Sequence, residues 1–302
     1  MSDDRLSEVF DLVQVRGLVS GGFAVRGPWE ARAAIRDPVK LIALVHGRVR
    51  LAADGLEDPI GLEAGDVAIL NSRSWLSLEG GAGDGLRRAI VPEEGFTHLV
   101  GADPGTDDVV IGAAVDINPA ARALLLQALP PVGHVRSSAG ATGLRSTLDR
   151  LLDEVAGHRV GSAFAIRQYG QLLLLEVLRA YVHQADLPPG WLRALTDERL
   201  RPALGLMHAE PGKPWRLEEL ARSAAMSRTS FAERFRTVAG VPPLTYLHRW
   251  RMLLAQRALR DGDVRVGSLA VELGYASESA FSTAFKREVG ESPLRYRHRV
   301  RA

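Results

Sequence analysis

The sequence predicts a multidomain α and β protein, in which an N-terminal β-barrel with flanking helices is followed by an all-α domain with two helix-turn-helix units. Three observations support this fold class. Short strand-like runs separated by Gly-Asp turns occupy residues 39–90. A helical pattern that begins at residue 217 recurs at an offset of fifty residues. A segment rich in Pro and Gly, residues 186–190, separates the two parts.

The charge of the chain is divided between these two parts. The net charge of +2 conceals 20 Lys and Arg against 12 Asp and Glu in residues 191–302, a net of +8. The first 190 residues hold 18 against 24, a net of −6. Because phosphate binding needs a cationic surface, only the C-terminal part suits a nucleic-acid partner. We therefore place domains at 1–185, with a helical part at about 118–185, and at 191–302, with a linker at 186–190.

The first helix-turn-helix unit is predicted at residues 217–240. Leu220 and Ala221 lie in a short amphipathic helix. Ser227 stands where an N-cap belongs, and Phe231 then begins the buried stripe of a second helix.

The second unit is predicted at residues 266–290, after a connecting helix at 243–260. Ser277 and Phe281 repeat the cap and the first buried aromatic residue fifty positions later. The Leu-Ala pair recurs at residues 269–270, one position out of step. A single-residue difference between the two turns explains this.

The second helix of each unit presents polar side chains away from its buried stripe. A helical bundle with a solvated charged face explains one such unit equally well, whereas two in tandem favour DNA reading. We expect the first helix, with its guanidinium groups, to carry more of the base discrimination, and the second helix, with its hydroxyl and ammonium groups, to carry more of the positioning on the phosphate backbone. The predicted DNA contacts are Arg228, Thr229, Glu233, Arg236, Ser277, Glu278, Ser279, Thr283, Lys286 and Arg287.

Three motifs carry a family resemblance over the final third of the chain. They are LAxxxxMS at residues 220–227, Trp250-Arg251 in the connecting helix, and LAxxLGYxSxSxFSxAFKxxxGxSPxxYR at residues 269–297. This part resembles the DNA-binding domain of the AraC/XylS family of bacterial transcription regulators. The resemblance implies a homeodomain-like double helix-turn-helix domain that contacts two adjacent major-groove segments of double-stranded DNA. It also implies RNA polymerase as a partner if the protein is an activator.

The N-terminal part resembles the cupin-like sensor barrel of many such regulators in its order of strand, LEAGDVAIL and strand. That resemblance implies a small-molecule effector, of unknown identity, bound in the barrel. Trp29, His46 and Trp75 either line the barrel interior as effector-binding residues or belong to the core. The apolar helical stretches within residues 144–182 either pack inside this domain or form a homodimer interface.

Several function classes are excluded or disfavoured. The chain has no Cys, so it has no disulfide, thiolate nucleophile or Cys-ligated zinc. No His-x-His accompanies His46, so we predict no metal site, no cofactor and no catalytic residues. The alternative, a cupin-type metal enzyme with a DNA-binding appendage, is distinguished by its metal content. A ligand-free architectural DNA binder is disfavoured, because the first 190 residues or so would then have no function.

Targeting signals are also not apparent. The N-terminus reads MSDDRLSEVF, which lacks an apolar signal core. No apolar run approaches the ~20 residues that span a bilayer. We therefore expect a cytoplasmic protein without a membrane partner.

Overall fold

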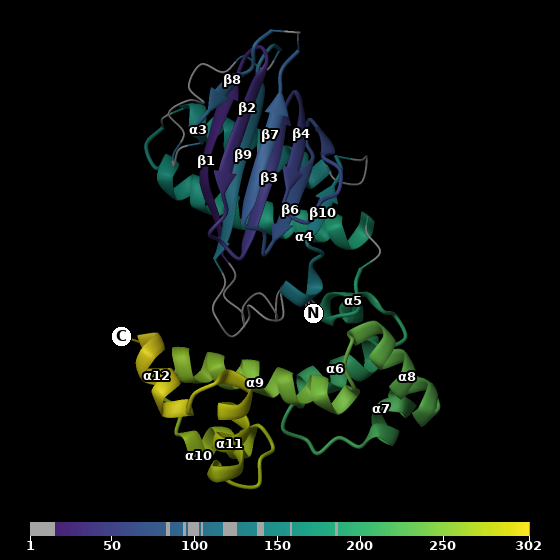
Figure 1. The fold of residues 1–302 in the computed structure, drawn as a ribbon. Helices are drawn as coiled ribbons and strands as arrows, with labels where there is room; N and C mark the ends of the chain where they lie inside the picture. The colour runs from purple at the N-terminus through teal and green to yellow at the C-terminus, as the bar shows by residue number, and fades with distance from the viewer. Residues whose placement is uncertain are drawn as a thin grey trace. The chain divides into compact units, whose positions relative to one another are not determined.

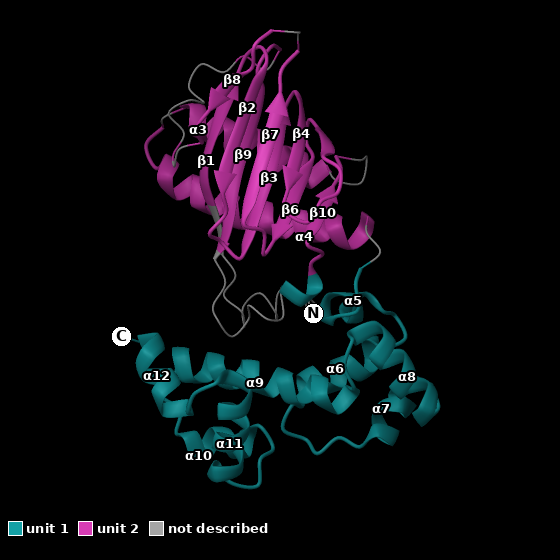
Figure 2. Cartoon of the chain, in the orientation of Figure 1, with its two compact units in different colours: residues 1–14, 118–128, 187–302 teal, residues 15–117, 129–186 magenta. Residues whose placement is uncertain are grey.

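The computed structural model describes residues 16–82, 85–92, 95, 103, 105–116, 126–137, 142–157, 159–184 and 187–301. They form two compact units, shown in magenta and teal in Figure 2. The β-rich unit takes its described residues from 16–116 and 129–184, and the helical unit from 126–128 and 187–301. Over the described residues, every helix is either too short or too polar to cross a bilayer.

The β-rich unit is built on two five-stranded sheets (Figure 1). Sheet A has the order β1 (Arg16–Val25), β9 (Asp108–Asp116), β3 (Val39–His46), β6 (Val67–Asn71) and β10 (Val132–Val135), with all neighbours antiparallel. Sheet B has the order β5 (Ile60–Glu63), β4 (Arg48–Ala53), β7 (Trp75–Gly80), β2 (Trp29–Ala34) and β8 (Arg88–Ile90). The described strands thus make the β-rich cupin-like domain that the sequence predicted, as two separate five-stranded sheets and not as a closed barrel.

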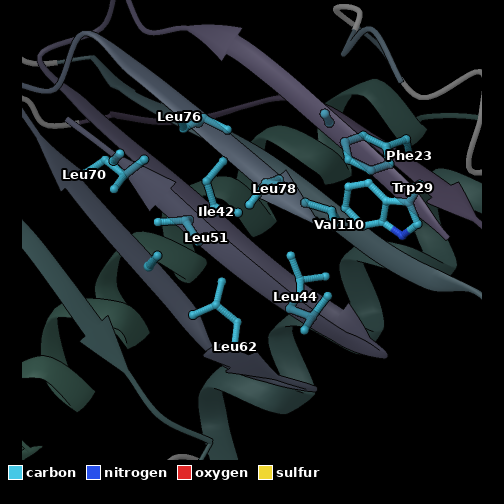
Figure 3. Packing of buried hydrophobic residues seen from close by; sticks show 14 of the residues in the cluster. Phe23, Trp29, Ile42, Leu44, Leu51, Leu62, Leu70, Leu76, Leu78 and Val110 are labelled. Carbon is cyan, nitrogen blue, oxygen red and sulfur yellow. The ribbon is translucent and has the colours of Figure 1, made fainter. Parts of the chain in front are cut away.

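The core of this unit fills the space between the sheets. Residues of sheet B alternate as a half-buried strand requires, so that Val49 and Leu51 are buried while Arg48 and Arg50 are exposed. Figure 3 shows the large apolar side chains that meet in this layer, among them Phe23, Trp29, Ile42, Leu44, Leu51, Leu62, Leu70, Leu76, Leu78 and Val110.

Two helices cover the outer face of sheet A. They are α3 (Thr142–Gly157) and α4 (Ser162–Gln184), which pack on each other and on β1, β3 and β10. Sheet A is therefore buried on both faces, as the unbroken burial of β6 shows. Three of the four leucines of α3 and three of the five leucines of α4 are buried within the unit. The stretch 118–185, expected to be helical, also supplies strand β10, which pairs with β6.

The helical unit repeats one arrangement twice. From residue 187 to residue 301 its helices are α5 (Trp191–Thr196), α6 (Arg201–Ala209), α7 (Leu217–Ser223), α8 (Arg228–Ala239), α9 (Pro243–Asp261), α10 (Val266–Glu272), α11 (Glu278–Val289) and α12 (Pro293–Arg301). Figure 1 shows the long α9 joining the α7–α8 pair to the α10–α11 pair.

Equivalent aromatic rings pack in the core of each half of this unit. Ring centroids of Phe231 and Phe235 lie 5.7 Å apart, and Tyr246 lies 5.5 Å from Phe235. Phe281 and Phe285 lie 5.7 Å apart, and Tyr296 lies 5.6 Å from Phe285. The duplication seen in the sequence is thus a duplication of the core.

Residues of the expected linker pack on the helical unit. Leu187 is buried, and the Gly190 N–H donates to the Val238 carbonyl at 2.9 Å. Asp186, the first linker residue, lies outside the described residues. The helical unit therefore includes the chain from residue 187 onward.

Candidate nucleic-acid interface

Helices α8 and α11 begin and end in the same way. The Ser227 hydroxyl accepts from the Ser230 N–H at 3.2 Å, and the Ser277 hydroxyl accepts from the Ala280 N–H at 3.1 Å. These N-caps satisfy backbone donors that have no partner inside a helix. Gly240 and Gly290 follow the helices with φ of 71° and 90°, a left-handed conformation that favours glycine. The first and last residues of α11 therefore each lie fifty positions after the first and last residues of α8.

The two turns differ by one residue, as the sequence predicted. Four residues separate α7 from α8, and five separate α10 from α11. Residues 225 and 274 both have positive φ, and the next N–H in each turn donates to the equivalent carbonyl, Ala221 or Ala270, at 2.9 Å. The extra residue is Ala276, between this point and the cap.

All ten predicted DNA contacts are exposed at the surface of the two helix-turn-helix units. On α8, residues 228, 229, 233 and 236 follow helical spacing opposite the buried Phe231 and Phe235. On α11, residues 278, 279, 283, 286 and 287 do the same opposite Phe281 and Phe285. Ser277 combines exposure with its capping bond. Each helix thus offers one continuous polar face to a ligand outside the domain.

Each of the two faces carries two cations and one carboxylate. Arg228 Nη1 lies 3.1 Å from Glu218 Oε1, but both side chains are more than half exposed, so this pair contributes little to stability. Within the described chain, Arg236, Lys286 and Arg287 form no ion pair. Their cationic groups are free to meet phosphate or base oxygens.

Further exposed residues share these faces and were not predicted. Ser230 lies in the first turn of α8, where its hydroxyl contacts that of Ser227 at 3.0 Å. Thr237 is exposed and is the counterpart of Arg287 at the fifty-residue offset. The fifty-residue repeat was the signal that could have identified Thr237 as a candidate DNA contact, because Arg287 was predicted to be one. Arg222, exposed at the end of α7, had no such signal.

The predicted effector-binding residues do not converge on one cavity. Trp29 is fully buried, and its indole N–H donates to Asp108 Oδ2 at 2.8 Å. Trp75 lies on the outer face of sheet B, where the Arg32 guanidinium sits 4.8 Å from its ring centroid. His46 is half-buried at the end of β3.

A cavity of about 790 Å³ opens beside the beginning of β4, the end of β7, the end of β10 and strand β5. Arg50, Arg136 and His134 line it. Buried Asp66 holds its wall, because its carboxylate contacts His134 Nε2 at 2.8 Å and accepts the backbone N–H groups of residues 63 and 137. Asp66 was not among the predicted site residues; its signal in the sequence is its place after Gly65 in LEAGDVAIL.

A second buried carboxylate, Asp108, supports the same end of the unit. It accepts the Trp29 indole N–H and the backbone N–H groups of Arg48 and Gly81, at 2.8, 3.2 and 2.6 Å. Over the described ranges, His, Asp and Glu side chains nowhere gather in threes at a spacing that would hold a metal ion. His98 lies outside the described residues.

Comparisons with known proteins match both units. A family model described as Cupin matches residues 4–183, and one described as Helix-turn-helix domain matches residues 220–299. A putative AraC-like transcription regulator of Streptomyces lividans is 34% identical over 97% of this chain and 98% of its own. The regulator AlkR of Acinetobacter baylyi is 37% identical over 57% of this chain and 58% of its own. The DNA-binding domain of AdpA, solved with a target DNA, is 34% identical over 35% of this chain and 95% of its own, with a TM-score of 0.33.

Proposed function

The chain belongs to the AraC-like transcription regulators, with a cupin domain followed by a helix-turn-helix domain, and we propose that α8 and α11 read two adjacent major-groove segments of double-stranded DNA. The observation that carries this proposal is the equivalence of the two helices. They have the same cap, the same buried aromatic pair and a polar face at the same positions. Two such helices in one domain form a bivalent DNA reader.

The connecting helix has a suitable length for this task. Its 19 residues at ~1.5 Å each span about 28 Å. One turn of DNA is ~34 Å long, so successive major grooves on one face lie at a similar distance. The net charge of +8 over residues 191–302 favours a polyanion.

Selection of binding sites by the full chain from a random duplex library tests the proposal. The selected DNA should carry two short blocks whose centres lie about 10 base pairs apart, and affinity should fall steeply with salt. Replacing Ser279 and Thr283 with Ala should erode one block, and replacing Arg228 and Arg236 should erode the other. Arg201→Ala, which removes an exposed charge of α6, is the matched control. A single selected block would overturn the two-helix proposal.

We infer that the β-rich unit binds a small anionic effector at the cavity beside Asp66. Its volume of about 790 Å³ falls within the roughly 300–1,000 Å³ usual for ligand sites. Arg48 and Arg87 are paired with Glu63 and Glu79. Among the described residues, no carboxylate pairs with Arg50 or Arg136. Guanidinium groups bind carboxylates and phosphates with two parallel hydrogen bonds.

A thermal-shift screen of small carboxylates and phosphates, run on the full chain, tests this effector site. A compound that raises the melting temperature should lose most of its effect in Arg50→Ala and Arg136→Ala. An unchanged shift in both variants would place the effector elsewhere.

We also infer a homodimer through the outer face of α4. Phe164 and Leu172 are 62% and 40% exposed, whereas Leu173, Val177 and Leu178 of the same helix are buried. Phe164 and Leu172 lie eight residues apart, which is close to two helical turns and puts both on one face. Sedimentation of Phe164→Glu and Leu172→Glu variants should show a monomer. A wild-type mass equal to one chain would refute the dimer.

A further inference from the structure

We propose that Arg251 is a positioning residue that locks the two helix-turn-helix units at one separation, and so sets the spacing of the DNA site. This proposal rests on the proposed reading of two major-groove segments. No DNA contact is assigned to Arg251, because its side chain points into contacts within the protein.

The guanidinium of Arg251 contacts both units from the connecting helix. Its Nε donates to the Pro211 carbonyl at 2.6 Å, and its Nη2 donates to the Lys213 carbonyl at 2.9 Å. These residues belong to the loop that joins α6 to α7, directly before the first unit. The guanidinium carbon also lies 6.0 Å from the ring centroid of Tyr275, in the turn of the second unit. One side chain thus joins the beginning of one unit to the turn of the other.

Two glycines bring the same segments into backbone contact. A Cβ added to Gly212 would lie 2.1 Å from the Glu272 carbonyl oxygen, and one added to Gly274 would lie 2.1 Å from the Gly212 carbonyl oxygen. Neither position has room for a side chain. The loop before α7 therefore lies directly on the turn before α11, and Arg251 holds the loop there through its two carbonyls.

A second residue of α9 holds the other side of that turn. The Tyr275 hydroxyl and His248 Nδ1 lie 3.0 Å apart. The turn of the second unit is therefore fixed to α9 at Tyr275 and to the loop of the first unit at Gly274. We name the set Gly212, His248, Arg251, Gly274 and Tyr275 the interlock.

The interlock adds stiffness that a single connecting helix lacks. Helices bend gently under load, and a bend in α9 alone would change the angle between α8 and α11. The contacts of Arg251 and His248 with the loop and the turn beside α9 resist such a bend. For two linked binding modules, a stiff connection gives the highest effective concentration at one spacing, whereas a flexible one spreads it over many.

Affinity measured on a series of duplexes tests the role of Arg251. The two selected blocks are moved apart or together by one to three base pairs, and the full chain is titrated on each duplex. For the wild type, moving the blocks should lower affinity by about 100-fold, the loss expected when a second linked module no longer engages. Arg251→Ala should flatten this profile to less than about tenfold, with the largest loss at the original spacing.

Matched variants separate positioning from folding. Arg257→Ala removes an exposed arginine of the same helix and should keep the wild-type spacing profile. Arg251→Lys keeps the charge but lacks the planar fork that holds both carbonyls in fixed directions, so its profile should lie between the two. Affinity for a duplex with one block should be the same for all variants, which shows that the individual units remain folded. Gly212→Ala, which forces the loop off the turn, should flatten the profile like Arg251→Ala.

The outcomes distinguish the two levels of the proposal. If the wild type shows no preferred spacing, the reading of two grooves fails. If the wild type prefers one spacing and both Arg251→Ala and Gly212→Ala keep that preference, the interlock does not set it and the present proposal is overturned.

Discussion

Replacing the cations of the two recognition helices one at a time should separate base reading from backbone positioning. A guanidinium that holds a guanine edge with two hydrogen bonds contributes about 1–3 kcal/mol of discrimination. Arg236 forms no ion pair among the described residues, so its deletion should cost that full amount, or about 5- to 150-fold in Kd. Arg228 must first leave Glu218, an exposed pair that contributes about 0–1 kcal/mol. The loss in Arg228→Ala should therefore be smaller.

Lys286 has a different expected signature. An ammonium on a phosphate binds every sequence alike, so Lys286→Ala should weaken specific and random duplexes equally and lower the salt slope by about one. Fluorescence anisotropy over a salt series, together with binding-site selection for each variant, measures both effects. Arg201→Ala is the control for loss of one exposed charge. The reasoning is refuted if Lys286→Ala alters the selected bases while Arg228→Ala and Arg236→Ala leave them unchanged.

Four further outcomes are expected. Burial lowers the pKa of His248, so on acidification the unfolded chain binds a proton at a higher pH than the folded chain does. The contribution of His248 to stability should be complete above about pH 6.5 and should be lost as the pH falls through the lowered pKa. Thermal melts over this pH range should show a smaller loss of stability for His248→Gln. A fragment starting at Leu187 should bind DNA alone and melt higher than one starting at Trp191, because it keeps the Gly190 bond to Val238. Trp75→Ala should change ligand-induced thermal shifts less than Arg50→Ala, and equal losses would contradict the cavity assignment. Elemental analysis after dialysis against chelator should find no stoichiometric transition metal, whereas one ion per chain would revive the metal-enzyme alternative.

The helical unit was predictable because its signals are local. An N-cap serine, a buried Phe pair and a C-terminal glycine lie within fourteen residues of one another, from Ser227 to Gly240. Each signal acts through backbone geometry within one helix, so it needs no knowledge of distant partners. The interlock was not predictable, since Arg251 meets Pro211 forty residues away, and nothing in the local pattern marks that contact.

The β-rich unit shows the opposite case. The strands themselves follow from the alternation of apolar and polar residues and from the turns between them. Their arrangement into two sheets depends on pairings such as β1 with β9, which join residues about ninety positions apart. The roles of the two tryptophans were half predictable. In β7 the buried Leu76 and Leu78 alternate with Trp75, so its outward direction follows from period two. That the buried indole N–H of Trp29 donates a hydrogen bond to Asp108 could be learned only from the fold.

The extra Ala276 in the second turn has a consequence for how such units can vary in length. Inserting a residue inside a helix rotates everything beyond it by about 100°, which would turn a reading face into the core. The cap serine resets the helical register after the turn, so Ala276 changes nothing beyond it: Phe281 and Phe285 remain buried like Phe231 and Phe235. Length changes are therefore tolerated before the cap and forbidden after it, and the two copies have been free to diverge at that one place.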